Sequence, residues 1–125
     1  MNIPGDLKYS RSHEWVKQDG DSVLIGITDH AQKELGDLVF INLPNEGDEV
    51  KKGEAFADVE SVKAVSDIIS PVSGVVGAVN EALLDAPELI NQDAYAAWIA
   101  RVKDVSGMEG LLSAGEYEEL LKKEA

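Results

Sequence analysis

The chain contains two β-rich segments, one on each side of a single lysine. This arrangement limits the possible folds more than any other feature. Residues 53–59 are rich in small and β-compatible side chains, and residues 65–69 supply three branched apolar ones after Lys63. At about 3.3 Å per residue, two such arms hold a tight turn far from the glycines near their bases. A lysine in that turn offers a primary amine to any enzyme that can bind the hairpin. On spacing alone, an ordinary solvated turn lysine remains the alternative.

Two further motifs flank this hairpin. Residues 47–53 read Gly-Asp-Glu-Val-Lys-Lys-Gly, and residues 71–74 read Pro-Val-Ser-Gly. The pair resembles the biotinyl/lipoyl carrier superfamily, whose members place Gly-Asp-x-Val-x-x-Gly before a modified lysine and Pro-x-x-Gly after it. Several motifs in the correct order are more specific than one short pattern.

Within that superfamily, the chain most resembles the glycine cleavage H-protein family. The similarity runs from about Leu7 to Leu121 and includes four segments in that family's usual order. These are Ser12-His13-Glu14-Trp15, Gly26-Ile27-Thr28-Asp29-His30-Ala31-Gln32, Leu35-Gly36-Asp37-Leu38-Val39-Phe40 and Glu60-Ser61-Val62-Lys63-Ala64.

The hydrophobic pattern predicts a mostly β fold. The resemblance implies a barrel-sandwich hybrid of two antiparallel sheets with short helices and a C-terminal helix. We expect one lipoyl-carrier domain spanning residues 1–125, because a chain of 125 residues is long enough to bury a single modest core.

Local signals place several elements. Asp19-Gly20 between β-rich runs predicts a hairpin. Thr28 or Asp29 can cap a short helix that ends at Gly36. Residues 37–43 are apolar on both faces, which predicts an interior strand, and residues 48–51 predict a short edge strand.

The C-terminal region changes to a helical pattern. Two Ser-x-x-Glu sequences, at residues 106–109 and 113–116, fit the capping box that begins a helix. Apolar residues after the second box recur at helical spacing. We therefore expect a short helix followed by a terminal helix packed on the β core.

Composition excludes several functions. The net charge is −13, from 24 acidic and 11 basic residues, so we expect neither nucleic acid nor an anionic membrane as a partner. The chain has no cysteine, so redox sulfur must come from a prosthetic group. No segment resembles a signal peptide or a membrane span. We expect a cytoplasmic protein, or a mitochondrial matrix protein if a transit peptide has been removed.

The resemblance implies lipoic acid in amide linkage to Lys63. It also assigns Glu60 and Gly74 to recognition by the attaching enzyme, a lipoate ligase or a lipoyl/octanoyl transferase. Biotin carriers have methionine on both sides of the lysine, whereas this chain has Val62 and Ala64. Lipoyl domains of 2-oxo-acid dehydrogenases usually read Asp-Lys-Ala and lack the first two of the four segments above.

The function implied by the resemblance is that of a shuttle in glycine catabolism. A pyridoxal-phosphate glycine decarboxylase would load an aminomethyl unit onto the lipoyl group. A tetrahydrofolate-dependent aminomethyltransferase would remove the one-carbon unit, and dihydrolipoamide dehydrogenase would reoxidise the dithiol. The chain itself has no activated nucleophile or acid–base pair, so we expect a carrier and not an enzyme.

A carried cationic amine would be protected by a carboxylate in a cleft that excludes water. Glu14, next to Ser12, is the first candidate for contacting that amine, and Asp67 is the second; the alternative is that both carboxylates are simple surface residues. His13 and His30 lack a metal-ligand setting, so we expect packing or hydrogen-bonding roles and no metal site.

Two other functions remain open at this point. The chain could serve mainly as a lipoyl donor that relays the group to 2-oxo-acid dehydrogenases, or it could be an unmodified scaffold. One segment, residues 91–98, has alanines where the family commonly has glycines, so we expect local turn geometry to differ there.

Overall fold

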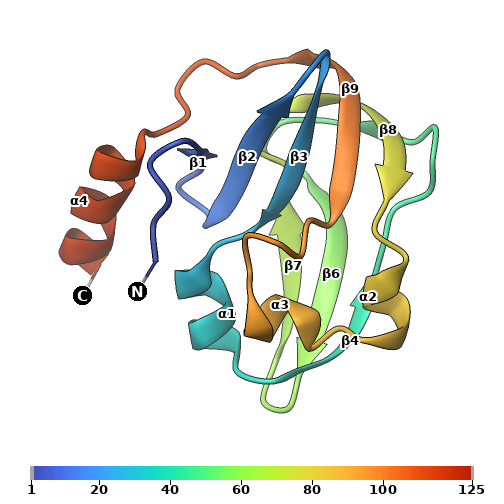
Figure 1. Ribbon diagram of the computed structural model, residues 1–125, viewed down its shortest axis with the longest axis vertical. Coiled ribbons are helices and arrows are strands. Elements are labelled where there is room, and N and C mark those ends of the chain that lie inside the picture. The colour runs from blue at the N-terminus through green and yellow to red at the C-terminus, as the bar shows by residue number, and fades with distance from the viewer. Residues whose placement is uncertain (1, 125) are drawn as a thin grey trace.

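The computed structural model describes residues 2–124, which form two antiparallel β-sheets with short helices and a C-terminal helix (Figure 1). The six-stranded sheet has the order β1 (Lys8–Tyr9), β2 (Glu14–Asp19), β3 (Ser22–Ile27), β9 (Ala100–Ser106), β8 (Ser73–Val79) and β5 (Glu49–Val50). The three-stranded sheet has the order β4 (Leu38–Asn42), β6 (Ala55–Ser61) and β7 (Val65–Ile69). The helices are α1 (Asp29–Leu35), α2 (Ala82–Asp85), α3 (Leu89–Gln92) and α4 (Ala114–Glu124). The predicted fold class is confirmed.

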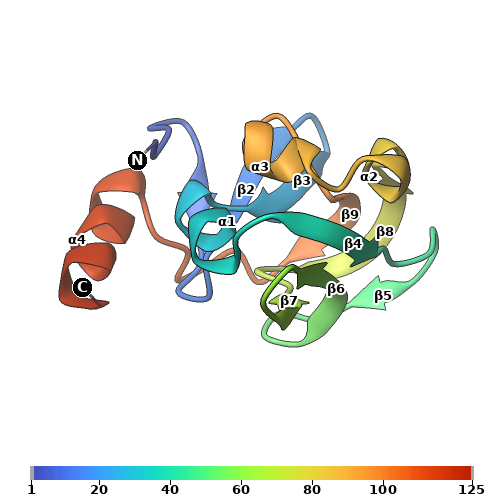
Figure 2. The same ribbon diagram turned by 90° about the horizontal axis from the view of Figure 1, so that it is seen from below.

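The two sheets pack face to face around a core of branched apolar side chains (Figure 2). Ile27 comes from the large sheet, and Ile41, Val59 and Ile68 come from the small one; all four are almost fully buried. Burying each such side chain contributes roughly 1.5–3 kcal/mol, so this layer fixes the inward face of every strand near Lys63. Within residues 2–124, no helix is both long enough and apolar enough to cross a membrane.

The predicted carrier hairpin is present as β6 and β7. Its turn extends beyond the helices at one end of the molecule (Figure 1). The backbone N–H of Ser61 donates to the carbonyl of Ala64 at 2.8 Å, and the Ser61 hydroxyl oxygen accepts from the N–H of Ala64 at 3.0 Å. The turn is thus closed from both backbone and side chain, which holds Lys63 at its tip.

Several local predictions are confirmed. The β2–β3 hairpin turns at Gly20, and β5 lies at the edge of its sheet. The Thr28 side chain accepts from the N–H of Ala31 at the start of α1, and Gly36 ends that helix with φ 83°. Ser113 and Glu116 form the expected reciprocal capping box at α4, with hydrogen bonds of 2.9 and 3.2 Å.

Two local predictions are wrong. Residues 37–43 do not form an interior strand, because β4 is an edge strand whose bulge between Leu38 and Phe40 leaves Val39 and Phe40 exposed. The capping-box sequence at residues 106–109 begins no helix. Gly107 adopts φ 77° there, in the left-handed region, so the chain turns where a helix would have to start.

Candidate carrier site

Lys63 is exposed at the tip of the β6–β7 hairpin. The adjoining N–H of Val62 donates to the carbonyl of Asp37 at 3.0 Å, which attaches the tip to the loop between α1 and β4. A Cβ added at Gly36 would lie 3.4 Å from Cε of Lys63, so the lysine stem passes over this glycine. The base of the lysine is therefore held next to the end of α1 while its amine remains accessible.

A cleft of about 790 Å³ opens beside this position. It is bordered by α1, by the free edge strand β7 and by the start of β2. Its apolar wall includes Ile27, Leu35, Val59 and Ile68. Leu35 immediately precedes Gly36, so the lysine stem and the cleft share a margin. Pockets that hold small ligands are typically about 300–1,000 Å³ and mostly apolar, as here.

All three predicted arm-contact residues, Ser12, Glu14 and Asp67, line this cleft. Ser12 and Glu14 reach it from the start of β2, and Asp67 reaches it from β7. At about 3.3 Å per residue, Asp67 lies roughly 13 Å along the strand from Lys63. The structure thus brings together residues that are far apart in the sequence, on one side of the carrier lysine.

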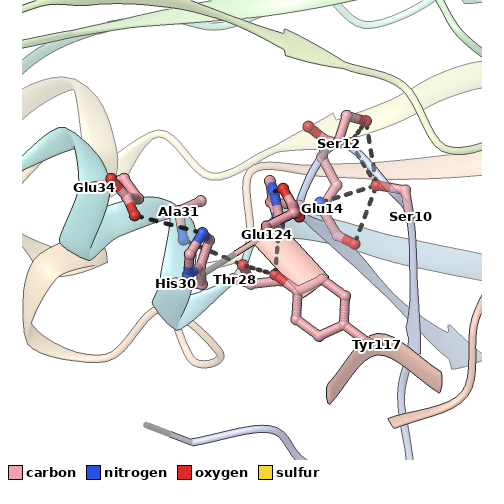
Figure 3. A network of polar contacts seen from close by, with 10 residues as sticks. Ser10, Ser12, Glu14, Thr28, His30, Ala31, Glu34, Tyr117 and Glu124 are labelled. Carbon is pink, nitrogen blue, oxygen red and sulfur yellow. Dashed lines mark hydrogen bonds and ion pairs between the residues drawn. The ribbon is translucent and has the colours of Figure 1, made fainter. Parts of the chain in front are cut away.

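Glu14 is the one buried carboxylate that lines the cleft among residues 2–124, with 3% of its surface exposed. The hydroxyls of Ser10 and Ser12 each donate to its Oε1 at 2.6 Å (Figure 3). Burial raises the pKa of Glu14 from 4.5 to about 7, although these hydrogen bonds act in the opposite direction. Among residues 2–124, no basic side chain forms an ion pair with it.

The remaining wall comes from residues that the sequence analysis did not place at this cleft. His13, His30, Leu121 and Glu124 line the cleft from three separate elements or loops. The two histidine rings lie 4.6 Å apart, and Nε2 of His13 pairs with Glu124 at 3.2 Å. No local pattern could have indicated these contacts, because each joins separate elements or loops, and His13 and Glu124 lie more than a hundred positions apart.

Tyr117 attaches this wall to the sheet. Its hydroxyl lies 2.7 Å from Oγ1 of Thr28 (Figure 3). The same hydroxyl lies 2.8 Å from Nδ1 of His13. Its ring stacks on Tyr9 with centroids 4.7 Å apart. Burial raises the pKa of Tyr117, so it remains a neutral hydrogen-bonding group. The predicted hydrogen-bonding role of His13 is confirmed.

The two predicted recognition residues occupy different places. Glu60 is exposed on β6, three residues before Lys63. Gly74 lies in β8 of the other sheet, paired with Val50. A Cβ at Gly74 would lie 2.5 Å from Cγ1 of Val102 and 2.6 Å from the carbonyl of Lys103, so close strand packing requires glycine here.

The site fits a long, mainly apolar group that ends in a cation. Its margin adjoins the lysine stem, its wall is apolar, and its far end holds the buried Glu14 with Asp67 near the mouth. A buried carboxylate without a basic partner is costly, and a cationic ligand would relieve that cost.

Comparison with known proteins is consistent with this geometry. Residues 7–124 match the family model described as Glycine cleavage H-protein. The chain is 56% identical to a glycine cleavage system H protein from Lachnoclostridium phytofermentans, covering 99% of this chain and 98% of the relative. It is 51% identical to one from Bacillus licheniformis, covering 99% and 100% respectively.

A solved structure is also similar. The crystal structure of a glycine cleavage system H protein from Mycobacterium marinum superposes with a TM-score of 0.90 at 42% sequence identity. The match covers 96% of this chain and 99% of that chain.

Proposed function

The chain belongs to the glycine cleavage H-protein family, and from that premise we propose that Lys63 is the lysine that carries its lipoyl group. Family membership makes the chain a carrier protein of the glycine cleavage system. The alternative of a lipoyl relay for 2-oxo-acid dehydrogenases is not favoured, because the matched family and relatives are named for glycine cleavage.

The position of Lys63 supports the attachment. The turn that holds it is closed by hydrogen bonds between Ser61 and Ala64 of the hairpin itself, and the amine is exposed. Amide formation would remove the lysine charge and leave a long flexible tether. Such a tether raises the effective concentration of its reactive end at each partner's active site.

When bound, the lipoyl group supplies a dithiolane that accepts and returns a one-carbon amine unit. The chain's own residues would do the rest. The apolar wall with Leu35 and Ile68 excludes water, and Glu14, oriented by Ser12, pairs with the cationic amine. Asp67 adds a second carboxylate at the mouth of the cleft.

The observation that carries this proposal is the buried Glu14, which has no basic partner among residues 2–124 and lies in the cleft whose margin adjoins the stem of Lys63. A buried carboxylate without a basic partner lowers the stability of the fold. Its presence in the cleft is explained if a cationic ligand binds there during function. Among the same residues, no group of histidine, aspartate and glutamate side chains is arranged to hold a metal ion.

The specific partners follow from the same premise. We assign loading to a glycine decarboxylase, unloading to an aminomethyltransferase and reoxidation to dihydrolipoamide dehydrogenase, with a lipoate ligase or lipoyl/octanoyl transferase as the attaching enzyme. One domain covering residues 1–125 is sufficient for this role. The cytoplasm is the proposed location, since the bacterial relatives lend no support to the mitochondrial alternative.

Reconstitution tests the function directly. The lipoylated protein, added to the other three glycine cleavage components, should support tetrahydrofolate-dependent release of ammonia from glycine. A Lys63→Arg chain prepared in the same way should support none, because it cannot form the amide. Equal activity of the two chains would refute the assignment of Lys63.

A further inference from the structure

Large apolar side chains are exposed in one place on the β6–β7 side of the molecule. Four of the five exposed large apolar residues among residues 2–124 belong to the hairpin or to its neighbour β4. We call these four the hairpin patch: Val39 (55% exposed), Phe40 (46%), Val62 (70%) and Val65 (69%). The fifth, Leu84, lies on α2 and is 57% exposed.

Strand register brings the hairpin patch together. Phe40 pairs with Glu60, and Glu60 pairs with Val65, so these three form one row across the small sheet. Directly paired residues point to the same face, and here that face is the one turned away from the core. The bulge in β4 leaves Val39 exposed as well. Val62 extends the patch to the turn beside Lys63.

The patch has an acidic border. Glu60 lies within the row, and the next row away from the turn contains Asp58 and Asp67. Asp37 lies at the tip, where its carbonyl holds Val62. An apolar centre with carboxylates around it matches a partner surface that has an apolar recess bordered by arginine or lysine.

We propose that the hairpin patch is the docking surface for the enzyme that acylates Lys63, an inference that rests on the proposed function. In that reaction the Nζ amine attacks the activated carbonyl of a lipoyl adenylate. The amide C–N bond forms, the bond from carbonyl carbon to phosphate oxygen breaks, AMP leaves and the amine loses one proton. The reacting atom is therefore one lysine side chain from the backbone.

Because Nζ lies only one lysine side chain from the backbone, the patch is better placed to bind the attaching enzyme than the other partners. An enzyme that acts on Nζ has to contact the surface immediately around the hairpin turn, which is the patch. The partners that act on the far end of the attached group can work at a greater distance from the turn. The cleft lies along the free edge of β7, whereas the patch is on the outer face of the same sheet.

The test measures acylation kinetics of the full-length apo chain with purified lipoate ligase, lipoic acid and Mg-ATP. The variant is Phe40→Thr with Val65→Thr, which places threonine, a β-branched residue favoured in strands, at both positions. The matched control is Leu84→Thr, which removes an equally exposed apolar side chain from α2. Circular dichroism and the urea midpoint of each chain verify folding, and Val65→Thr alone is used if the double variant is unstable.

We expect the carrier's KM to rise about tenfold in the double variant, with kcat changed less than about twofold. Leu84→Thr should match the unchanged chain, and Phe40→Leu should keep most of the affinity. KM should also rise with added salt, because the acidic border is screened. Equal kinetics for the double variant and the Leu84 control would overturn the proposal.

Two other results have distinct meanings. If the unchanged chain is not acylated at Lys63 at all, the proposed function itself is refuted. If the double variant is acylated normally but, once lipoylated, is slower with the decarboxylase or aminomethyltransferase, the patch serves that partner and our assignment is wrong.

Discussion

The hydroxyl of Ser12 donates to Oε1 of Glu14 at 2.6 Å across the intervening His13, whose backbone is left-handed with φ 74°. This local geometry turns Glu14 into the cleft, where its side chain is buried. Left-handed backbone is uncommon for residues other than glycine. The contacts of His13 with Tyr117 and Glu124 explain why it persists here.

The pH dependence of stability should report the burial of Glu14. Its pKa is about 7 in the folded chain and ordinarily 4.5, so the folded state holds the proton more tightly. The stabilisation from this proton is complete below pH 4.5 and is lost as the pH rises through 7. Glu14→Gln should remove this dependence. Between pH 4.5 and pH 8, the unfolding free energy of the unchanged chain should therefore fall by about 2–3 kcal/mol relative to that of the Glu14→Gln variant.

Urea unfolding at a series of pH values measures this difference. Glu34→Gln is the control, because that carboxylate also lines the cleft but its side chain is 72% exposed. Parallel pH profiles for the Glu14 variant and the unchanged chain would show that Glu14 titrates normally.

Glu14 should also protect the loaded arm. Glu14→Ala should still be lipoylated, yet lose its carried amine to hydrolysis about tenfold faster, because a charge-assisted hydrogen bond contributes roughly 1.5–3 kcal/mol. The measurement is the lifetime of the loaded carrier by mass spectrometry, with Glu34→Ala as the control. An unchanged lifetime would remove Glu14 from the arm site.

Much of the fold follows from local sequence signals. Thr28 and Gly36 mark the ends of α1, and Ser113 with Glu116 starts α4, because each of these contacts is made within a few residues. The hairpin around Lys63 was predictable for the same reason. The need of a carried cationic amine for a carboxylate also suggested Glu14, Ser12 and Asp67, which the fold places in one cleft.

The errors arise where one residue breaks a pattern. The bulge in β4 adds Val39 to one strand, so alternation no longer reports which face is buried. The first Ser-x-x-Glu sequence fails because Ser106 still belongs to β9 and Gly107 turns the chain. The helical pattern predicted that α4 packs on the β core, but no local pattern encodes which of its residues join His30 at the cleft, where Leu121 and Glu124 lie.

The alanines of residues 91–98 do not strain the backbone. His13 and Asp104 are the non-glycine residues with positive φ in residues 2–124, so these alanines adopt ordinary conformations. The carbonyl of Ala94 accepts a 3.0 Å hydrogen bond from Nε1 of Trp15, and Ala97 is buried. The segment thus supports the tryptophan without glycine.

Gly74 provides a test that separates packing from recognition. Gly74→Ala should destabilise the chain by several kcal/mol, because its Cβ would overlap Val102 and the carbonyl of Lys103. Gly77→Ala, in the same strand, should be tolerated, since its nearest neighbour would be an ordinary 3.7 Å away. Urea unfolding tests both, and normal stability with lost lipoylation in the Gly74 variant would instead favour direct recognition by the attaching enzyme.

Tyr117 should stabilise the wall formed by α4. Tyr117→Phe keeps the stacking on Tyr9 but removes the hydroxyl between Thr28 and His13, so unfolding free energy should fall by about 1–2 kcal/mol. Amide hydrogen exchange in α4 should become faster. Lys122→Ala, which removes only an exposed ion pair with Glu119, should change stability by less than about 0.5 kcal/mol. Unchanged exchange in Tyr117→Phe would show that other contacts hold the helix.

The central claim is that Lys63 carries a lipoyl group. The most direct test is the intact mass of the protein purified from its native cell, followed by peptide mapping. We predict a gain of about 188 Da, lipoic acid minus water, on the peptide containing Lys63. A chain that stays unmodified when lipoic acid and a competent ligase are supplied would contradict the account, and a gain of about 226 Da would identify biotin instead.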